Sequence, residues 1–361
     1  MAGIYIHVPF CMSRCIYCGF YSTTALSLRQ RYIDAVCREW EMRRHELAEP
    51  VDTIYLGGGT PSQLAAEQLA QLFSILPATA SEVTIECNPD DVTAEYAGAL
   101  ALLPVNRVSM GVQTFDDRRL QFLNRRHTAA QVQQAVDNLR RTGITNISAD
   151  LMYGFPDESL EAWQDDIRQM LALDVAHLSA YCLMVEEGTA LQRMGVSPCD
   201  EETERQMYDT LIDQLTAAGY EHYEISNFAR RGYRSRHNSS YWHDIPYIGL
   251  GAAAHSYIGS HRQWNTSDIH QYIAAIEQGR RCFEQELIDE DTHYNDCITV
   301  ALRTSDGLDL SALPPRYQDY CKREARRFLS DGLLQLNGQR LSLTRKGLFI
   351  SDYIMSSLII A

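Results

Sequence analysis

The sequence predicts an α/β fold in which a partial, TIM-like (β/α)6 barrel is followed by a small α+β domain. Three observations lead to this prediction. Over the first two-thirds of the chain, short apolar runs alternate with amphipathic stretches, as in parallel sheets covered by helices. Glycine-rich or polar segments follow the predicted strands, at the end where such barrels collect their chemistry. From about residue 289 the pattern changes to amphipathic helices and a hairpin.

The predicted barrel consists of strands that alternate with helices. The strands cover residues 4–8, 53–56, 82–86, 107–112, 146–151 and 177–182. The helices cover residues 27–47, 62–75, 93–102, 129–142 and 160–172. Because each helix lies between two strands, we expect a parallel sheet with its helices outside.

The C-terminal part is predicted to be winged-helix-like. Residues 272–285 indicate a helix and a connection, and amphipathic helices follow over residues 290–303 and 317–331. A hairpin over residues 332–336 and 340–343 has Asn337-Gly338 at its turn, and a helix over residues 344–359 closes the chain. The local charge is mixed, so DNA binding is not inferred. The chain thus divides into a core barrel (1–225), a connecting segment (226–288) and a C-terminal domain (289–361).

Composition limits the classes of function. The chain has 361 residues, 45% of them hydrophobic, so it can bury one large core and a smaller unit. It has neither a long apolar run nor a secretory signal, and a cytoplasmic protein is expected. A net charge of −15 argues against nucleic acid as a partner. Ten cysteines in so long a chain do not indicate a disulfide scaffold.

Residues 11–20, CMSRCIYCGF, place Cys11, Cys15 and Cys18 close together in the chain. Their thiolates are soft ligands for iron or zinc. A structural zinc site or a fully ligated four-iron cluster needs four protein ligands, and Phe20 stands where a fourth cysteine would follow. The spacing therefore indicates a [4Fe–4S] cluster with one open iron. A structural zinc site, or free thiols clustered by chance, is the alternative.

This C-x3-C-x2-C pattern, with Tyr17 before its last cysteine, resembles the radical S-adenosylmethionine (SAM) signature. The resemblance implies that SAM chelates the open iron through its amino and carboxylate groups. It also implies that one electron from the cluster cleaves SAM to methionine and a 5′-deoxyadenosyl radical.

Polar residues and glycines follow the next four predicted strands. Gly57-Gly58-Gly59 lets the backbone approach a ligand closely and point its N–H groups at it. Glu86, Gln113 and Asp150 stand at later strand ends, and Arg125 falls in the next helical stretch. Taken singly, each residue has an ordinary alternative, such as a tight turn, a surface charge or a loop cap. Together they suit SAM, because carboxylates bind its ammonium and hydroxyls and arginine binds its carboxylate.

From Tyr5 to about Gly259 the sequence is similar to the oxygen-independent coproporphyrinogen III oxidase family of radical SAM proteins. The resemblance implies SAM ligands at Tyr5, Tyr17, Gly58, Gly59, Thr60, Glu86, Gln113, Arg125 and Asp150.

Two departures from the oxidase pattern point to the sister branch of heme chaperones, the HemW proteins. The oxidase proper has C-x3-C-x2-C-x-C, where this chain has Phe20, and this chain starts its first strand almost at residue 1, without the oxidase's N-terminal extension. Gly19, where the chaperone branch usually has aspartate, is a smaller departure.

A second candidate site lies in residues 223–257. Its HNxxYW pattern resembles the heme-binding motif of the chaperone branch, which implies a heme site at His237, Asn238, Tyr241 and Trp242. His237 is the leading axial ligand, and His243 and His255 are weaker candidates. The alternative is a loop of packed aromatic residues with a hydrogen-bonded core histidine.

The predicted function is that of a radical SAM protein which binds a [4Fe–4S] cluster, SAM and heme and delivers heme to apo-hemoproteins. Acceptors would be respiratory cytochromes or oxidases, with peripheral contact to membrane hemoproteins; the electron donor is not identified. No residue is assigned as catalytic, and whether the chain is an enzyme is left open. The main alternative is an oxygen-independent oxidase that converts coproporphyrinogen III to protoporphyrinogen IX with SAM. Another radical SAM methyltransferase or oxidoreductase would leave HNxxYW unexplained.

Overall fold

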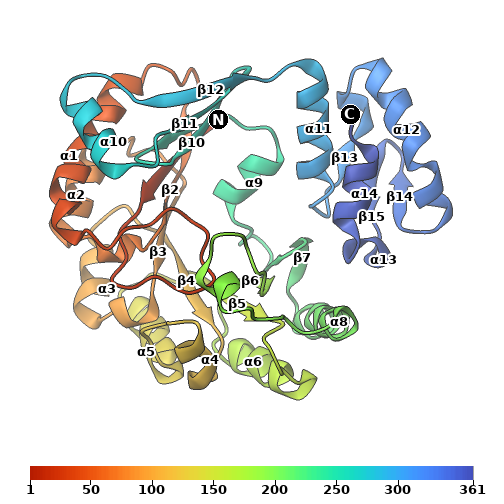
Figure 1. Cartoon of the computed structure of the whole chain (residues 1–361), viewed down its shortest axis with the longest axis horizontal. Coiled ribbons are helices and arrows are strands. Elements are labelled where there is room, and N and C mark those ends of the chain that lie inside the picture. Colours follow the sequence, from red (N-terminus) through yellow and green to blue (C-terminus); the bar gives the residue numbers. More distant parts are fainter. Residues whose placement is uncertain (361) are drawn as a thin grey trace.

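The computed structural model describes residues 1–360 and contains a curved twelve-stranded sheet with helices on its outer face (Figure 1). Its centre is a run of parallel strands in sequence order. These are β1 (Ala2–Val8), β2 (Val51–Gly58), β3 (Glu82–Cys87), β4 (Arg107–Gln113), β5 (Asn146–Tyr153) and β6 (His177–Cys182). Each predicted strand lies within an observed one, and the predicted partial α/β barrel is confirmed.

Helices connect these strands. They are α1 (Arg29–Arg43), α2 (Ala66–Ile75), α3 (Ala94–Leu100), α4 (Asp117–Phe122), α5 (Ala129–Arg141) and α6 (Leu160–Ala172). Short 3-10 turns η1 (Leu26–Leu28), η2 (Pro61–Gln63) and η3 (Pro89–Asp91) precede three of them. The helix predicted over residues 62–75 is therefore interrupted, because Leu64 is extended after η2. Within residues 1–360, four helices were not predicted: α4, α7 (Ala190–Arg193), α8 (Glu201–Ala217) and α9 (Arg236–Trp242).

The sheet continues beyond the barrel strands on both sides. Next to β6 lie β8 (Asn227–Ala229) and β7 (Glu221–Glu224), both antiparallel. On the other side β9 (Tyr247–Leu250) pairs parallel with β1, followed by antiparallel β10 (His255–Ile258), β11 (His261–Asn265) and β12 (Phe283–Leu287). Residues 226–288 thus extend the barrel sheet, and the three-part division of the chain stays a prediction. The connection expected after α10 (Ile269–Glu277) is the strand β12.

Side chains alternate along the barrel strands between an apolar outer face and a polar inner face. Ile4, Ile6, Ile54 and Leu56 belong to the main hydrophobic core under the helices. The intervening positions are mainly polar or glycine: Gly3, Tyr5, His7, Thr53, Tyr55, Thr84, Glu86, Arg107, Ser109, Ser148, Asp150, His177 and Ser179. The barrel interior is therefore built for polar chemistry.

Helix α9 (Arg236–Trp242) packs against β1 and β2 and also meets α11 (Glu290–Ala301), so it lies between the barrel and the C-terminal domain (Figure 1). Ser235 caps it, and its first N–H groups, from Arg236 and His237, donate to the carboxylate of Glu82 at the start of β3. This anchor holds α9 at the amino-terminal end of the barrel strands.

The C-terminal domain has its own hydrophobic core. It contains α11, β13 (Leu308–Asp309), η4 (Leu310–Ala312), α12 (Pro315–Ser330), β14 (Leu334–Asn337), β15 (Arg340–Leu343), α13 (Arg345–Leu348) and α14 (Ser351–Leu358). The predicted hairpin is present, but Asn337 pairs with Arg340, so the turn is Gly338-Gln339. The closing helix is divided into α13 and α14. In residues 1–360 no helix is long and apolar enough to cross a membrane.

Candidate cluster and cofactor site

The cysteine loop leaves β1 at the carboxyl end of the sheet and is held at its base and its middle. Thr23 N–H donates to Pro9 O (2.7 Å), and Cys11 N–H donates to Thr23 O (2.9 Å). Ile16 N–H donates to Leu123 O (3.2 Å), and Ile16 O accepts from Leu191 N–H (2.9 Å). Backbone hydrogen bonds to three separate segments therefore fix the loop that carries the thiols.

Cys11, Cys15 and Cys18 are free thiols with different neighbours. The Thr60 hydroxyl lies 3.4 Å from Cys11 Sγ, and the Arg125 guanidinium lies 3.6 Å from Cys15 Sγ. Burial raises the pKa of Cys11 and of Cys18, so loading with a metal cluster must release protons. Soft sulfur donors with an adjacent cation fit an iron–sulfur cluster.

The three thiols do not form a site for a single metal ion. Within residues 1–360, no group of three or more His, Cys, Asp or Glu side chains is arranged to hold one ion. In a four-iron cluster each thiolate binds a different iron, so the sulfur atoms need not converge on one point.

The glycines after β2 allow close packing against the cysteine loop. Gly58 has φ +111°, and a Cβ there would lie 2.6 Å from the His7 ring. A Cβ on Gly59 would lie 2.7 Å from the Pro9 carbonyl and 3.0 Å from Cys11 Sγ. The expectation that these N–H groups point at a ligand is not met, because Gly58 N–H donates to Glu86 and Gly59 N–H donates to Val8 O.

Glu86 and Asp150 lie on the inner face of β3 and β5. Tyr55 Oη donates to Glu86 Oε1 (2.7 Å), and Gly58 N–H donates to Oε2 (3.1 Å). Burial raises the pKa of Glu86 to about 7 and that of Asp150 to about 6. These carboxyl groups are therefore set to change charge near neutral pH.

Gln113 and Arg125 come together over Gly111. Gln113 has φ +68°, in the left-handed region, next to an irregularity in the β4–β5 pairing. A Cβ on Gly111 would lie 2.9 Å from Gln113 Nε2 and 3.0 Å from the Arg125 guanidinium. The prediction that Arg125 lies in a helical stretch is wrong, because Asn124 at φ +60° ends the turn after α4. Arg125 donates to Asn88 Oδ1 (2.8 Å) and to Gly111 O.

The two predicted tyrosine ligands come from different segments and have different neighbours. Tyr5 Oη is 3.1 Å from His7 Nδ1, and its ring stacks on Tyr55. Tyr17 sits on the cysteine loop beside Arg125 and Cys15, and burial raises its pKa. The structure thus gathers the predicted SAM residues at the carboxyl end and interior of the barrel.

The HNxxYW residues form α9, at the other end of the barrel. His237 is 1% exposed, its Nδ1 lies 2.8 Å from Thr53 Oγ1, and its Nε2 lies 2.8 Å from Tyr241 Oη. The ring stacks on Tyr55 at 5.1 Å, and burial lowers the pKa of His237 to about 3. Both ring nitrogens have partners, so ligation of a heme iron by His237 requires α9 to move. The assignment of His237 as axial ligand stays a prediction, and it requires this movement of α9.

The other members of the heme prediction are more accessible. Asn238 and Trp242 are half-buried, and the Trp242 ring meets Tyr223 edge-on. The His243 side chain is 48% exposed and lies 3.7 Å from Asp306. His255 is exposed and stacks on Trp264.

Several residues near the site were not singled out from the sequence. Tyr55 holds Glu86, Asn88 holds Arg125, and Arg107 lies inside the barrel with 1% exposure. The available signal was the inner-face position of Tyr55 and Arg107 in alternating strands and the place of Asn88 just after β3. Gly19 also has a structural explanation, because a Cβ there would lie 2.1 Å from Glu186 Oε2. A carboxylate from another segment thus occupies the place of the aspartate side chain.

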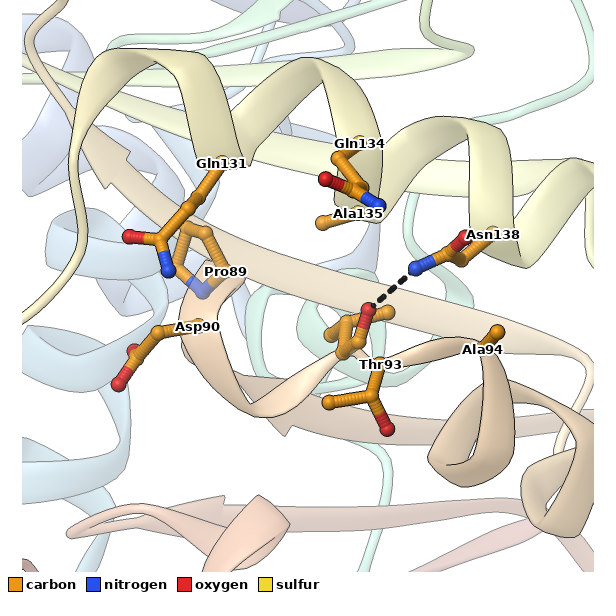
Figure 2. Close-up of a pocket in the computed structure, with 9 residues that line it drawn as sticks. Pro89, Asp90, Thr93, Ala94, Gln131, Gln134, Ala135 and Asn138 are labelled. Atoms are coloured by element: carbon orange, nitrogen blue, oxygen red, sulfur yellow. Dashed lines mark hydrogen bonds between the residues drawn. The ribbon is translucent and has the colours of Figure 1, made fainter.

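A cavity of about 220 Å³ lies elsewhere, between η3 and α5 (Figure 2). Asn138 crosses its floor and donates to Val92 O (2.9 Å), and Asp90 pairs with Arg126 (2.9 Å). No predicted site residue lines this cavity, so it is not the candidate site.

Comparisons with known proteins give a consistent result. The Radical SAM superfamily model matches residues 5–170, and the HemN C-terminal domain model matches residues 288–350. Heme chaperone HemW of Lactococcus lactis is 31% identical over 99% of this chain and 97% of its own length. HemW of Mycobacterium tuberculosis is 34% identical over 99% and 94%, and HemW of Escherichia coli is 36% identical over 70% and 69%.

Among solved structures, coproporphyrinogen III oxidase (HemN) of Escherichia coli superposes with a TM-score of 0.86 over 99% of this chain and 90% of that chain. The identity is 22%, so this likeness concerns the fold.

Proposed function

The chain belongs to the HemW family of radical SAM proteins, and from this we propose that it is a heme chaperone that binds heme and delivers it to apo-hemoproteins. The observation that carries this proposal is the similarity to heme chaperones over nearly the whole chain, including the C-terminal domain. Phe20, in place of the oxidase's additional cysteine, supports the chaperone over the coproporphyrinogen III oxidase alternative.

The chain's own residues are suited to a [4Fe–4S] cluster and SAM. Cys11, Cys15 and Cys18 would hold the cluster, which together with SAM supplies one-electron chemistry when bound. The surroundings of SAM would be Tyr5, Tyr17, Gly58, Gly59, Thr60, Glu86, Gln113, Arg125 and Asp150. In that set the carboxylates match an ammonium or hydroxyl groups, and the guanidinium of Arg125 matches a carboxylate.

Heme is the cargo in this proposal. His237, Asn238, Tyr241 and Trp242 on α9 are the proposed heme residues, with His237 as axial ligand once α9 has left the barrel end. His243 and His255 can reach an iron without that movement, because their side chains are accessible. We further propose respiratory cytochromes or oxidases as acceptors, peripheral contact with membrane hemoproteins and a cytoplasmic location.

An anaerobic heme titration of cluster-reconstituted protein tests the function. A stoichiometric complex with a defined Soret band is expected, with transfer of the heme to an apo-hemoprotein. Variants H237A, H243A and H255A identify the ligand by the loss of that band. Incubation with coproporphyrinogen III, SAM and a reductant is the counter-assay. Turnover to a fluorescent porphyrin, without heme binding, would overturn the proposal in favour of the oxidase.

A further inference from the structure

Arg107, on the inner face of β4, is a buried cation without a partner. Its residue exposure is 1%, and its Nε is buried without a hydrogen-bond partner. No ion pair within residues 1–360 includes Arg107, whereas buried Arg43 pairs with both Glu39 and Glu46. Burial of a guanidinium is costly unless a compensating charge is near. We therefore ask which carboxyl groups of the barrel interior could compensate the charge of Arg107.

Three carboxyl groups of the inner face lie near Arg107 in the sheet register, but Glu82, two residues before Thr84, already accepts hydrogen bonds from the N–H groups of Arg236 and His237. Glu86 and Asp150 are the other two. In the sheet register Arg107 stands opposite Thr84, two residues before Ser109, which pairs with Glu86. On the other side Gly111, four residues after Arg107, pairs with Asp150. Side chains two and four residues apart point to the same face of a strand, so the cation and both carboxyl groups face the barrel interior.

The other titratable groups that face these carboxyls are neutral or already bonded. Tyr5, Tyr55, Tyr181 and Tyr241 surround them from β1, β2, β6 and α9, and burial raises the pKa of each above its ordinary value. Arg125 also approaches Asp150, but its guanidinium is bonded to Asn88, to Gly111 and to the Cys15 thiol. Arg107 is thus the positive charge near Glu86 and Asp150 that has no side-chain hydrogen bond or ion pair of its own among the described residues.

We propose that Arg107 is a positioning residue that keeps Glu86 and Asp150 ionised, so that they can receive the cationic groups of SAM. This inference rests on the proposed SAM site. Burial alone favours the protonated carboxyls, and the charge of Asp150 further raises the pKa of Glu86. The charge of Arg107 lowers the pKa of both carboxyl groups. A guanidinium is suited to this task because it stays charged when buried.

The test compares R107M, which removes the charge, with R107K, which keeps it. Calorimetric titration of SAM into anaerobic, cluster-reconstituted protein is carried out from pH 6 to 9, in buffers of different ionisation enthalpy. In R107M the carboxyls should stay protonated to higher pH, so SAM affinity near pH 7 should fall about tenfold for each unit of pKa increase. The affinity should recover at high pH. At pH 8 the carboxyls of R107M should still be partly protonated, so SAM binding to this variant should release protons. The wild-type carboxyls are already ionised at this pH, so SAM binding to the wild type should release almost none.

Two further variants separate this role from a structural one. T84V changes the side chain opposite Arg107 without changing charge, and it should keep the wild-type pH profile. R107Q replaces R107M if that variant does not fold. R107K should restore both affinity and proton release. A loss of affinity that is equal at all pH values, or a profile that coincides with the wild type, would overturn the inference. Wild-type protein that binds no SAM would instead refute the proposed function.

Discussion

Polar side chains lie directly beside two of the cysteine thiols. The Arg125 guanidinium beside Cys15 and the Thr60 hydroxyl beside Cys11 give two of the thiols a polar neighbour that suits a thiolate. The sequence allowed prediction of the three cysteines, because their spacing is local. It did not predict Arg107, because only the sheet register brings that residue near Glu86 and Asp150.

Replacement of Cys15 by alanine should abolish the cluster, since two thiolates would remain for three iron positions. Anaerobic reconstitution followed by iron analysis and visible absorption measures this. C282A is the matched control, because Cys282 is exposed and lies outside the loop. A full four-iron complement in C15A would show that the ligand assignment is wrong.

Glu86 should make stability depend on pH. Its pKa rises from 4.5 to about 7 on folding, so the stabilisation from its bound proton is fully present below about pH 4.5 and is lost as the pH rises through 7. In E86Q, which cannot ionise, the decrease in unfolding free energy between pH 5 and 8 should be smaller by about 1–3 kcal/mol. Urea denaturation of the apoprotein measures this, with E67Q on the surface of α2 as control. An unchanged slope would contradict the prediction.

At the scale of elements, the local sequence pattern was sufficient to predict the barrel strands but not several of the helices and strands between and after them. The strands alternate apolar and polar residues, which fixes both their type and their inner face. Helix α9 was not predicted, because its seven residues lack a helical pattern and its anchor, Glu82, lies far away in the chain. Strand β12 could not be recognised either, since all five of its residues are exposed.

Helix α9 should loosen when Tyr241 is replaced by phenylalanine. The change removes the partner of His237 Nε2 and should destabilise the helix by about 1 kcal/mol. Hydrogen exchange over residues 236–242 should become faster, and heme should associate faster if His237 is the ligand. Y247F is the control, because Tyr247 packs on Tyr241 without that hydrogen bond. Faster exchange with unchanged heme association would favour His243 or His255.

At the scale of the whole molecule, an ion pair with a buried carboxylate links the barrel to the C-terminal domain. Glu224 of β7 is 2% exposed and pairs with Arg303 (2.8 Å), directly after α11. Ile225 N–H also donates to Arg303 O (3.1 Å) and Ser305 N–H to Tyr223 O (2.9 Å). Further ion pairs also cross between the two parts: Arg345 with Asp209 and Asp213, Arg262 with Asp296, and Arg234 with Asp306.

Replacement of Arg303 by methionine should uncouple the two parts of the chain. It leaves the Glu224 carboxylate buried without its cation, at a cost of about 3 kcal/mol. Differential scanning calorimetry should then resolve a separate, earlier transition for the C-terminal domain. R345M breaks only exposed pairs and should cost at most about 1 kcal/mol. A single transition with an unchanged midpoint in R303M would contradict this prediction.

The backbone hydrogen bonds at the base of the cysteine loop have a consequence for reassembly of a lost cluster. Pro9 and Thr23 close the loop by backbone hydrogen bonds, and Ile16 fastens its middle, without any contribution from metal. Because these bonds join backbone atoms, they do not depend on the thiol groups. Loss of a cluster from the thiols would therefore break none of them, and a new cluster could be assembled on the same polypeptide.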